Sequence, residues 1–338
     1  MKLATSKLPS AGPIGELVTE MISAPPADTL SAEPAEEAAR LVALVEDPLA
    51  DDDLQLALYL CFELHYRSFP EVDPAWEWDP SLLAARAVLE RAFFDALEAA
   101  VGPGEPVAPA EVGDLLFRLE SEAEGVSLSR HLEVNADIEE FREFVAHRSL
   151  YQLKESDPHS WAIPRLDGAA KTALLEVQAD EYGGGRVERM HQELFKQTMR
   201  WFGLDLTYGG YVGVAPAATL AVNNLMSLFG LHRANRGAIL GHLAAYEMTS
   251  SLPNRAYANG LRRLGGDPAA TAFYDEHVEA DAVHEQIAAN DLCGTFARDE
   301  PELAGQVLWG ARCALAVDNA WATTVLDAWA AGRSSLRN

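Results

Sequence analysis

The feature that most constrains this chain is a succession of segments whose apolar residues recur with the period of an α-helix. Ala, Leu, Glu and Arg, which all favour helices, dominate these segments, and Gly or Pro residues separate them. No segment shows sustained strand alternation, and neither a GxGxxG motif nor a Walker loop occurs. The pattern predicts an all-α protein with helices over 35–46, 51–66, 80–101, 108–124, 134–154, 168–200, 215–227, 232–249, 253–264, 268–289 and 299–331.

Composition divides the chain into three parts. Residues 1–34 are rich in Ser, Pro, Ala and Gly and are expected to form a flexible arm. We predict an N-terminal helical region over 35–130 and a helical bundle over 131–338, because the composition changes near 125–135.

The charge of the chain limits its partners. It carries 52 acidic and 26 basic residues, a net charge of −26, which does not favour binding to nucleic acid or to anionic membranes. We expect neither a signal peptide, because no apolar segment follows the first lysines, nor a transmembrane helix, because Arg312 and Asp318 interrupt the apolar stretch over 309–326. Three cysteines without a CxxC pair indicate neither a disulfide scaffold nor a zinc ribbon, so we expect a cytoplasmic protein.

The predicted helix over 268–289 contains an HxxxDxxH pattern formed by His277, Asp281 and His284. At about 100° per residue, the three side chains fall within about 60° of one another around the helix. Two imidazoles and one carboxylate on one stripe suit iron or manganese, and less typically zinc. The alternative is a polar stripe that faces solvent.

Glu247 lies on an otherwise apolar face of a predicted helix, beside Leu243 and Met248. A carboxylate in such a place is unfavourable unless it is paired or binds a metal. The alternative is a Glu at the helix border that pairs with Arg236 or Arg255.

His191 has two candidate carboxylate partners. Three consecutive glycines, 183–185, interrupt its helical segment at a cost of about 1 kcal/mol each relative to Ala, and such distortions often lie beside functional sites. Glu181 precedes His191 by ten residues and needs this distortion to reach it. Glu188 needs none, since Glu188-x-x-His191 matches the Glu-x-x-His pairs of ferritin-like bundles.

Glu155 ends an earlier helix, on the same face as His147 and Tyr151. The alternative for Glu155 is solvent exposure, and His159 is a rival for any ligand role there. Four helices thus deliver carboxylates or imidazoles, and such a set is what two iron ions need.

This order of residues resembles that of the haem-oxygenase-like diiron oxidases and oxygenases, also described as iron-containing redox enzymes. The resemblance covers roughly 140–290, and its most specific part is the HxxxDxxH pattern with a lone Glu247 thirty residues earlier. It implies a seven-helix, haem-oxygenase-like bundle without haem. Glu155 and the long gap between Glu181 and His191 resemble the N-oxygenating branch. The metal ligands that the resemblance implies are Glu155, Glu181, His191, Glu247, His277, Asp281 and His284.

The resemblance also implies an activity. Two Fe²⁺ per chain would activate O₂ to oxidise a small amino acid or amine, by N-hydroxylation or C–H oxidation, in natural-product biosynthesis. The alternatives at the same site are desaturation and cyclisation, or C–C cleavage, of an aliphatic amino acid or fatty acid. An alternative from another class is a non-catalytic iron-binding or helical interaction protein. A further alternative is a metal-free enzyme that uses Cys293 as its nucleophile. The sequence does not specify the electron donor.

Several further residues have expected roles. Arg255, Arg262 or Arg263 would bind a substrate carboxylate. Glu63 and His65 are expected to be structural, and the N-terminal helices are candidates for a homodimer contact. The aromatic residues expected to shape the substrate pocket are Tyr151, Tyr182, Tyr246 and Trp161.

Overall fold

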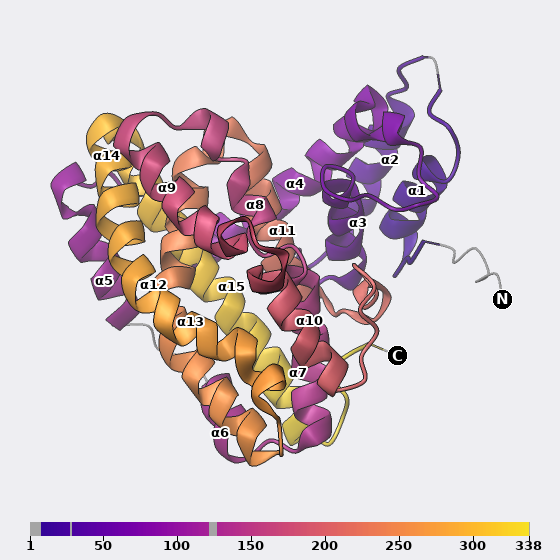
Figure 1. The fold of residues 1–338 in the computed structure, drawn as a ribbon. Coiled ribbons are helices and arrows are strands. Elements are labelled where there is room, and N and C mark those ends of the chain that lie inside the picture. The colour runs from indigo at the N-terminus through magenta and orange to yellow at the C-terminus, as the bar shows by residue number, and fades with distance from the viewer. Residues whose placement is uncertain (1–7, 28, 122–126, 338) are drawn as a thin grey trace. The chain divides into compact units, whose positions relative to one another are not determined.

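The computed structural model describes residues 8–27, 29–121 and 127–337. Within these ranges every regular element is a helix, so the predicted all-α class is confirmed. The chain divides into two compact units (Figure 1), which are described separately below. The first unit comprises residues 1–100 and 212–224, and the second comprises 101–211 and 225–338. The boundaries expected from composition, at 34/35 and 130/131, stay a prediction.

The first unit contains α1 (Pro13–Ile22), α2 (Glu33–Val42), α3 (Asp52–Glu63), most of α4 (Pro80–Val101) and the start of α11 (Ala217–Leu231). Helix α1 lies within the segment expected to be a flexible arm. Its apolar residues Ile14, Val18 and Ile22 are buried, and it packs against α3. The Asp53 carboxylate accepts hydrogen bonds from the backbone N–H groups of Ile14 and Gly15, at 2.7 and 2.8 Å. A side chain distant in sequence therefore satisfies the start of α1, which local composition does not reveal.

Glu63 and His65 lie in the interior of this unit. Glu63 is 1% exposed and His65 is 7% exposed. The His65 ring contacts the Arg86 guanidinium, which in turn forms an ion pair with Glu90 at 3.0 Å. These contacts support the structural role expected for both residues.

The second unit is a bundle built around one long helix, α12 (Arg236–Arg263). Helix α12 packs against α6 (Leu128–Val134), α13 (Pro268–Gln286) and α15 (Ala304–Ala330), and α10 (His191–Trp201) packs against α7 (Ile138–Gln152) and α13. Three short helices, α5 (Val112–Ser121), α8 (Asp157–Ser160) and α14 (Thr295–Asp299), and a π-helical segment, η8 (Ile287–Gly294), complete this part of the fold with α9 (Gly168–Glu181).

Glycines let the long helices of the bundle touch along their backbones. A Cβ atom at Gly241 of α12 would overlap the carbonyl oxygen of Val307, and one at Gly310 of α15 would overlap that of Ala238. Any larger residue would force these helices apart. This close packing fixes the position of Glu247, which lies further along α12.

The segment predicted as one helix over 168–200 is two helices. Helix α9 ends at Glu181 and α10 begins at His191. Gly183, Gly184 and Gly185 adopt positive φ angles of 65°, 59° and 77°, a region that L-residues avoid; they form one 3₁₀ turn, η4 (Gly183–Gly185), and a second, η5 (Val187–Arg189), follows. The chain folds back so closely that a Cβ at Gly183 would lie 2.6 Å from the backbone of Met190. The connection over 182–190 therefore closes on itself as a loop between two helices that both run antiparallel to α13 and η8.

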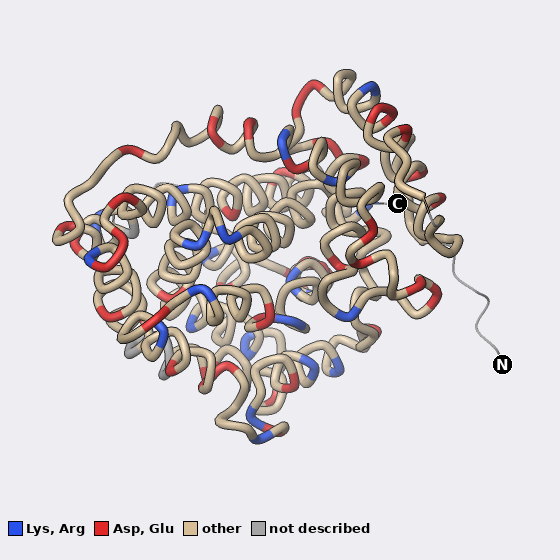
Figure 2. Tube along the Cα trace, turned by 90° about the horizontal axis from the view of Figure 1, so that it is seen from above, with Lys and Arg blue, Asp and Glu red and all other residues tan. Residues whose placement is uncertain are grey.

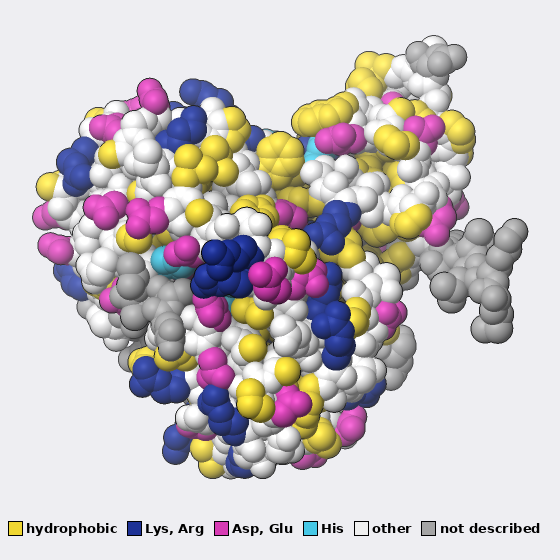
Figure 3. Space-filling model, viewed as in Figure 1, with side chains coloured by type: hydrophobic (Ala, Val, Ile, Leu, Met, Phe, Trp, Pro, Cys, Tyr) yellow, Lys and Arg dark blue, Asp and Glu magenta, His cyan; other side chains and the backbone are white. Residues whose placement is uncertain are grey.

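Charged residues are spread over both units, and acidic positions outnumber basic ones (Figure 2). On the face of the second unit seen in Figure 3, Lys and Arg side chains lie among Asp and Glu side chains. None of the described helices is both long and apolar enough to cross a membrane.

A buried histidine pair predicts how stability depends on pH. His159 Nε2 lies 3.1 Å from His242 Nδ1. Burial lowers the pKa of His159 to about 4 and lowers the pKa of His242 well below 6.5. Below pH 6.5 the unfolded chain takes up protons at both residues and the folded chain does not. The contribution of this pair to the free energy of unfolding is therefore greatest above pH 6.5, and it decreases as the pH falls below that value.

We expect this decrease to approach about 1.4 kcal/mol per pH unit for each histidine. Urea unfolding at about pH 7.5, 6.5 and 5.5, three values that span the ordinary pKa of histidine, measures this decrease. The double variant His159→Asn/His242→Asn should lose this contribution. An unchanged pH slope in the double variant would contradict the assignment.

Candidate metal centre

Six of the seven predicted ligands lie together in the second unit, and each is at most 8% exposed. Glu181 and His191 face each other across the glycine loop, as the last residue of α9 and the first residue of α10. Glu247 comes from the middle of α12, and Glu155 lies in the turn after α7. His277 and His284 lie two helical turns apart on α13.

Four of these side chains form a first donor group: Glu155, Glu181, His191 and His277. Each offers one ligand atom within 4.8 Å of the others. His191 Nδ1 lies 3.0 Å from Glu181 Oε2 and 3.8 Å from Glu155 Oε2. His277 Nε2 lies 3.4 Å from Glu155 Oε1.

A second donor group shares one residue with the first. It consists of Glu181, Glu247 and His284, whose ligand atoms again lie within 4.8 Å of one another. His284 Nδ1 lies 3.2 Å from Glu247 Oε2. Glu181 thus belongs to both groups. Asp281 falls within α13, but its side chain lies outside the described residues.

Hydrogen bonds on the outer side of two imidazoles orient them toward the centre. His277 Nδ1 donates to the carbonyl oxygen of Phe273 at 2.7 Å, which leaves Nε2 as the lone-pair atom that faces Glu155. His284 Nε2 donates to Asp180 Oδ2 at 3.1 Å, which leaves Nδ1 to face Glu247. Such outer partners are typical of histidines that bind metals. Sequence reasoning missed Asp180, which neighbours Glu181 in the chain.

The charges of these residues depend on one another. Burial opposes the ionisation of Glu181, but His191, His277 and His284 outweigh this effect and lower its pKa to about 2. Burial also opposes protonation of His284, yet Glu247 and Asp180 raise its pKa to about 9. Burial raises the pKa of both Glu155 and Glu247, although histidines nearby oppose this. Without a cation, the buried carboxylates therefore rely on protonated imidazoles.

The donor atoms are better placed to bind a metal ion than to form hydrogen bonds with one another. Three of them, Glu155 Oε2, His191 Nδ1 and His284 Nδ1, are buried and have no hydrogen-bond partner of suitable geometry. Atoms that share one metal at about 2.1 Å lie at most about 4.2 Å apart. The measured separations of 3.0, 3.2, 3.4 and 3.8 Å fall within this limit. Carboxylate and imidazole donors in this mixture suit iron.

The rivals named from sequence lie elsewhere. Glu188 is exposed in a 3₁₀ turn and belongs to neither donor group. His159 pairs with His242. Arg236, an alternative partner of Glu247, forms its ion pair with Glu300, at 3.0 Å from Nε. Cys293 is fully buried against the Leu240 carbonyl, and burial raises the pKa of its thiol, which does not favour a nucleophile.

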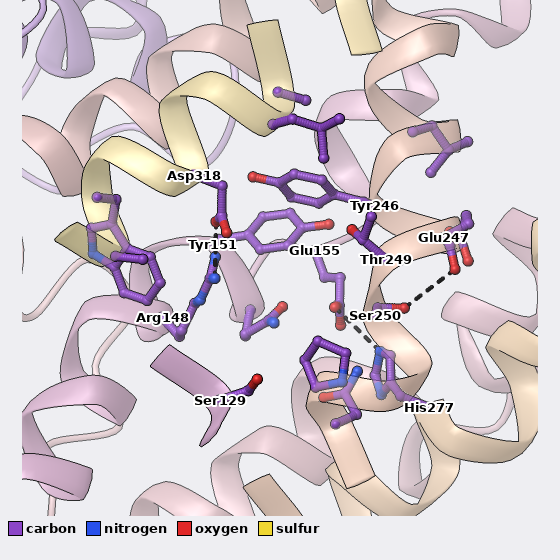
Figure 4. A pocket seen from close by; sticks show the side chains of 18 of the residues that line it. Ser129, Arg148, Tyr151, Glu155, Tyr246, Glu247, Thr249, Ser250, His277 and Asp318 are labelled. Atoms are coloured by element: carbon purple, nitrogen blue, oxygen red, sulfur yellow. Dashed lines mark hydrogen bonds and ion pairs between the residues drawn. The ribbon is translucent and has the colours of Figure 1, made fainter. Parts of the chain in front are cut away.

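A cavity of about 770 Å³ opens beside the donor groups (Figure 4). Glu155, Glu181, Glu247 and His277 form part of its wall. Its size lies within the range that is typical for small-molecule sites. Tyr151 and Tyr246 line the cavity as predicted.

Two other predicted aromatic residues do not line the cavity. Trp161 is half-buried, and the Tyr182 hydroxyl donates to Asp157 at 2.8 Å. Both lie in the connections that flank α9, where sequence proximity to Glu155 and Glu181 does not bring them to the cavity.

The arginines expected to bind substrate do not reach this cavity either. Arg255 is exposed, Arg262 forms an ion pair with Asp275 at 2.6 Å, and Arg263 donates to backbone carbonyls near α6. The charged pair in the cavity wall is instead Arg148 with Asp318, which sequence reasoning missed. A signal was present, because Asp318 interrupts the most apolar stretch of the last helix.

Fold and site together define a helical bundle with a buried carboxylate–imidazole centre beside a cavity. Comparison gives the family: a family model described as iron-containing redox enzyme matches residues 142–319, and the chain belongs to this family of oxidoreductases. The match includes every candidate ligand. The predicted haem-oxygenase-like bundle is confirmed.

Two individual proteins are similar to this chain. The nitrosourea synthase of Streptomyces achromogenes subsp. streptozoticus is 28% identical over 142 residues, which are 41% of this chain and 30% of that enzyme. The matched stretch thus spans less than a third of the relative. A CADD-like protein of unknown function from Nostoc punctiforme shares the fold, with a TM-score of 0.51 and 16% identity over 65% of this chain and 97% of the other.

Two glutamates near His191 provide a matched test of the centre. Glu181→Gln should lower the number of Fe²⁺ ions bound per chain in an anaerobic titration, because Glu181 belongs to both donor groups. Glu188→Gln should bind as many ions as the wild type, since Glu188 is exposed. Metal analysis after desalting measures both. Equal loss in the two variants, or loss in Glu188→Gln alone, would contradict this assignment.

Proposed function

We propose that this protein is an O₂-dependent diiron oxidase or oxygenase that oxidises a small amino-acid-like substrate. The observation that carries the proposal is the position of Glu181, which belongs to both donor groups beside one cavity. A single-metal site would need only one of these groups. A helical protein without a ligand would not need buried carboxylates beside a cavity.

Each donor group is assigned one Fe²⁺. Glu155, His191 and His277 would hold the first ion, Glu247 and His284 would hold the second, and Glu181 would bridge them. Asp281 is the seventh proposed ligand, on the evidence of the HxxxDxxH pattern. When bound, ferrous iron supplies the redox chemistry with O₂ that side chains lack.

The side chains of this chain provide geometry and control of protons. Phe273 and Asp180 fix which imidazole nitrogen carries a proton, through the hydrogen bonds to His277 and His284. Tyr151 and Tyr246 lie edge to face, with ring centres 5.8 Å apart, and form an aromatic wall that limits water near Glu155.

The type of oxidation is assigned by similarity. N-oxygenation is favoured, because a relative at 28% identity is a nitrosourea synthase, whose product contains oxidised nitrogen. Desaturation with cyclisation, and C–C cleavage, would use the same donor groups and are the alternatives within this class. The proposal includes a role in natural-product biosynthesis and a cytoplasmic location, in keeping with three free and buried cysteines.

The test combines iron binding with O₂ consumption. Wild-type protein should bind two Fe²⁺ per chain under anaerobic conditions, one for each donor group, and His284→Ala should bind at most one. An amino acid or amine should then stimulate O₂ uptake by the iron-loaded wild type, and this stimulation should be lost in His284→Ala. His131→Ala is the matched control, since His131 pairs with Glu140 outside the donor groups.

The outcomes separate the classes of function. Two bound ions without substrate-stimulated O₂ uptake would indicate an iron-binding protein. No iron above background, with no effect of His284→Ala, would overturn the metal centre itself.

A further inference from the structure

The cavity beside the metal centre contains an ion pair that the proposed metal chemistry does not use. Arg148 of α7 and Asp318 of α15 both line its wall, with Arg148 Nη2 at 2.9 Å from Asp318 Oδ1. The Arg148 side chain is 15% exposed and that of Asp318 is 35% exposed. Both charges therefore remain accessible from the cavity.

The surroundings hold the guanidinium in one orientation. The Trp321 ring covers one face of it, with Arg148 Cζ 3.9 Å from the ring centre. A guanidinium carries five N–H donors at its edge, and stacking on an aromatic ring leaves that edge available for bidentate binding of a carboxylate. One of these donors reaches Asp318, and two others hydrogen-bond the Tyr246 and Tyr257 side chains, so part of the edge remains for a ligand. The arrangement is preorganised to bind an anion next to an acidic group.

The pair also lies at a suitable distance from the candidate metal centre. Arg148, Tyr151 and Glu155 follow one another along and just beyond α7 (Figure 4). Glu155 lies seven positions after Arg148. The four positions up to the end of α7 at Gln152 rise about 6 Å along the helix, and the turn after α7 covers the rest. Thr249, Ser250 and Asn254 of α12 line the cavity as well and provide neutral polar groups. An extended small molecule bound at Arg148 would reach toward the donor groups.

We propose that Arg148 and Asp318 bind the α-carboxylate and the α-ammonium group of an amino-acid substrate. A positive and a negative group side by side complement a zwitterion, in which the opposite charges are also adjacent. A fatty acid would offer Asp318 no cation and a simple amine would offer Arg148 no anion, so each would complement only one of the two groups. This inference rests on the proposed function for the reaction, but it concerns how the substrate is recognised.

Binding measurements test this recognition without relying on turnover. Isothermal titration calorimetry under anaerobic conditions, with and without Fe²⁺, would be run with each of the proteinogenic L-amino acids. At least one should bind. Its decarboxylated and its desamino analogues, such as cadaverine and 6-aminohexanoate for lysine, should each bind more weakly by about tenfold or more, since each loses a charge-assisted contact.

Variants assign each preference to one side chain. Arg148→Gln should abolish the preference for the amino acid over the decarboxylated amine, and Asp318→Asn should abolish the preference over the desamino acid. Arg262→Gln is the matched control, because Arg262 forms an ion pair with Asp275 outside the cavity. It should leave both preferences unchanged.

A charge exchange separates recognition from a merely structural ion pair. The double variant Arg148→Asp/Asp318→Arg should regain much of the thermal stability that either single substitution removes, but it should not regain wild-type affinity for the amino acid. Recovery of both, binding of the analogues as tight as that of the amino acid, or no amino acid bound at all would overturn the proposal. Amino-acid binding that depends on Arg148 in a protein that takes up no iron would overturn the proposed function alone.

Discussion

The second unit is organised around the burial of three carboxylates in the interior of a helical bundle. Glu155, Glu181 and Glu247 are each 7 or 8% exposed, and an isolated carboxylate at such a place would be strongly unfavourable. Three imidazoles from α10 and α13 surround them, and the neighbouring carboxylates raise the pKa of His191 and His284 against the opposing effect of burial. The helices must hold these six groups together, and the glycine contacts between α12 and α15 supply the rigid frame for doing so.

Most of the helical content and two of the ligand-bearing segments were predictable from sequence because they depend on local periodicity. The predicted break before 253–264 was wrong, since α12 continues through Pro253 as one helix. His277 and His284 share one stripe of a regular helix, and Glu247 stands out on an apolar face. The choice between Glu181 and Glu188 was not predictable in this way. Helical spacing favours Glu188, whereas the loop that begins at Gly183–Gly185 brings Glu181 to His191. The sequence shows the glycines but not the direction in which the chain leaves them.

Other features depend on contacts between distant residues, and local patterns do not reveal them. Helix α1 begins where Asp53 accepts its first N–H groups, 39 residues along the chain. Arg148 and Asp318 are 170 residues apart and meet only because α7 and α15 border the same cavity. The arginines on α12 that sequence favoured instead bind carboxylates or carbonyls at other places.

The glycine loop has a consequence for how related chains are compared. Because Glu181 and His191 terminate separate helices, the number of residues between them is a loop length and not a helical register. Residues added to or removed from this connection alter the spacing of the motif while α9 and α10 keep their own packing. Alignments that require a fixed spacing between the two positions would therefore separate proteins whose centres are equivalent in three dimensions.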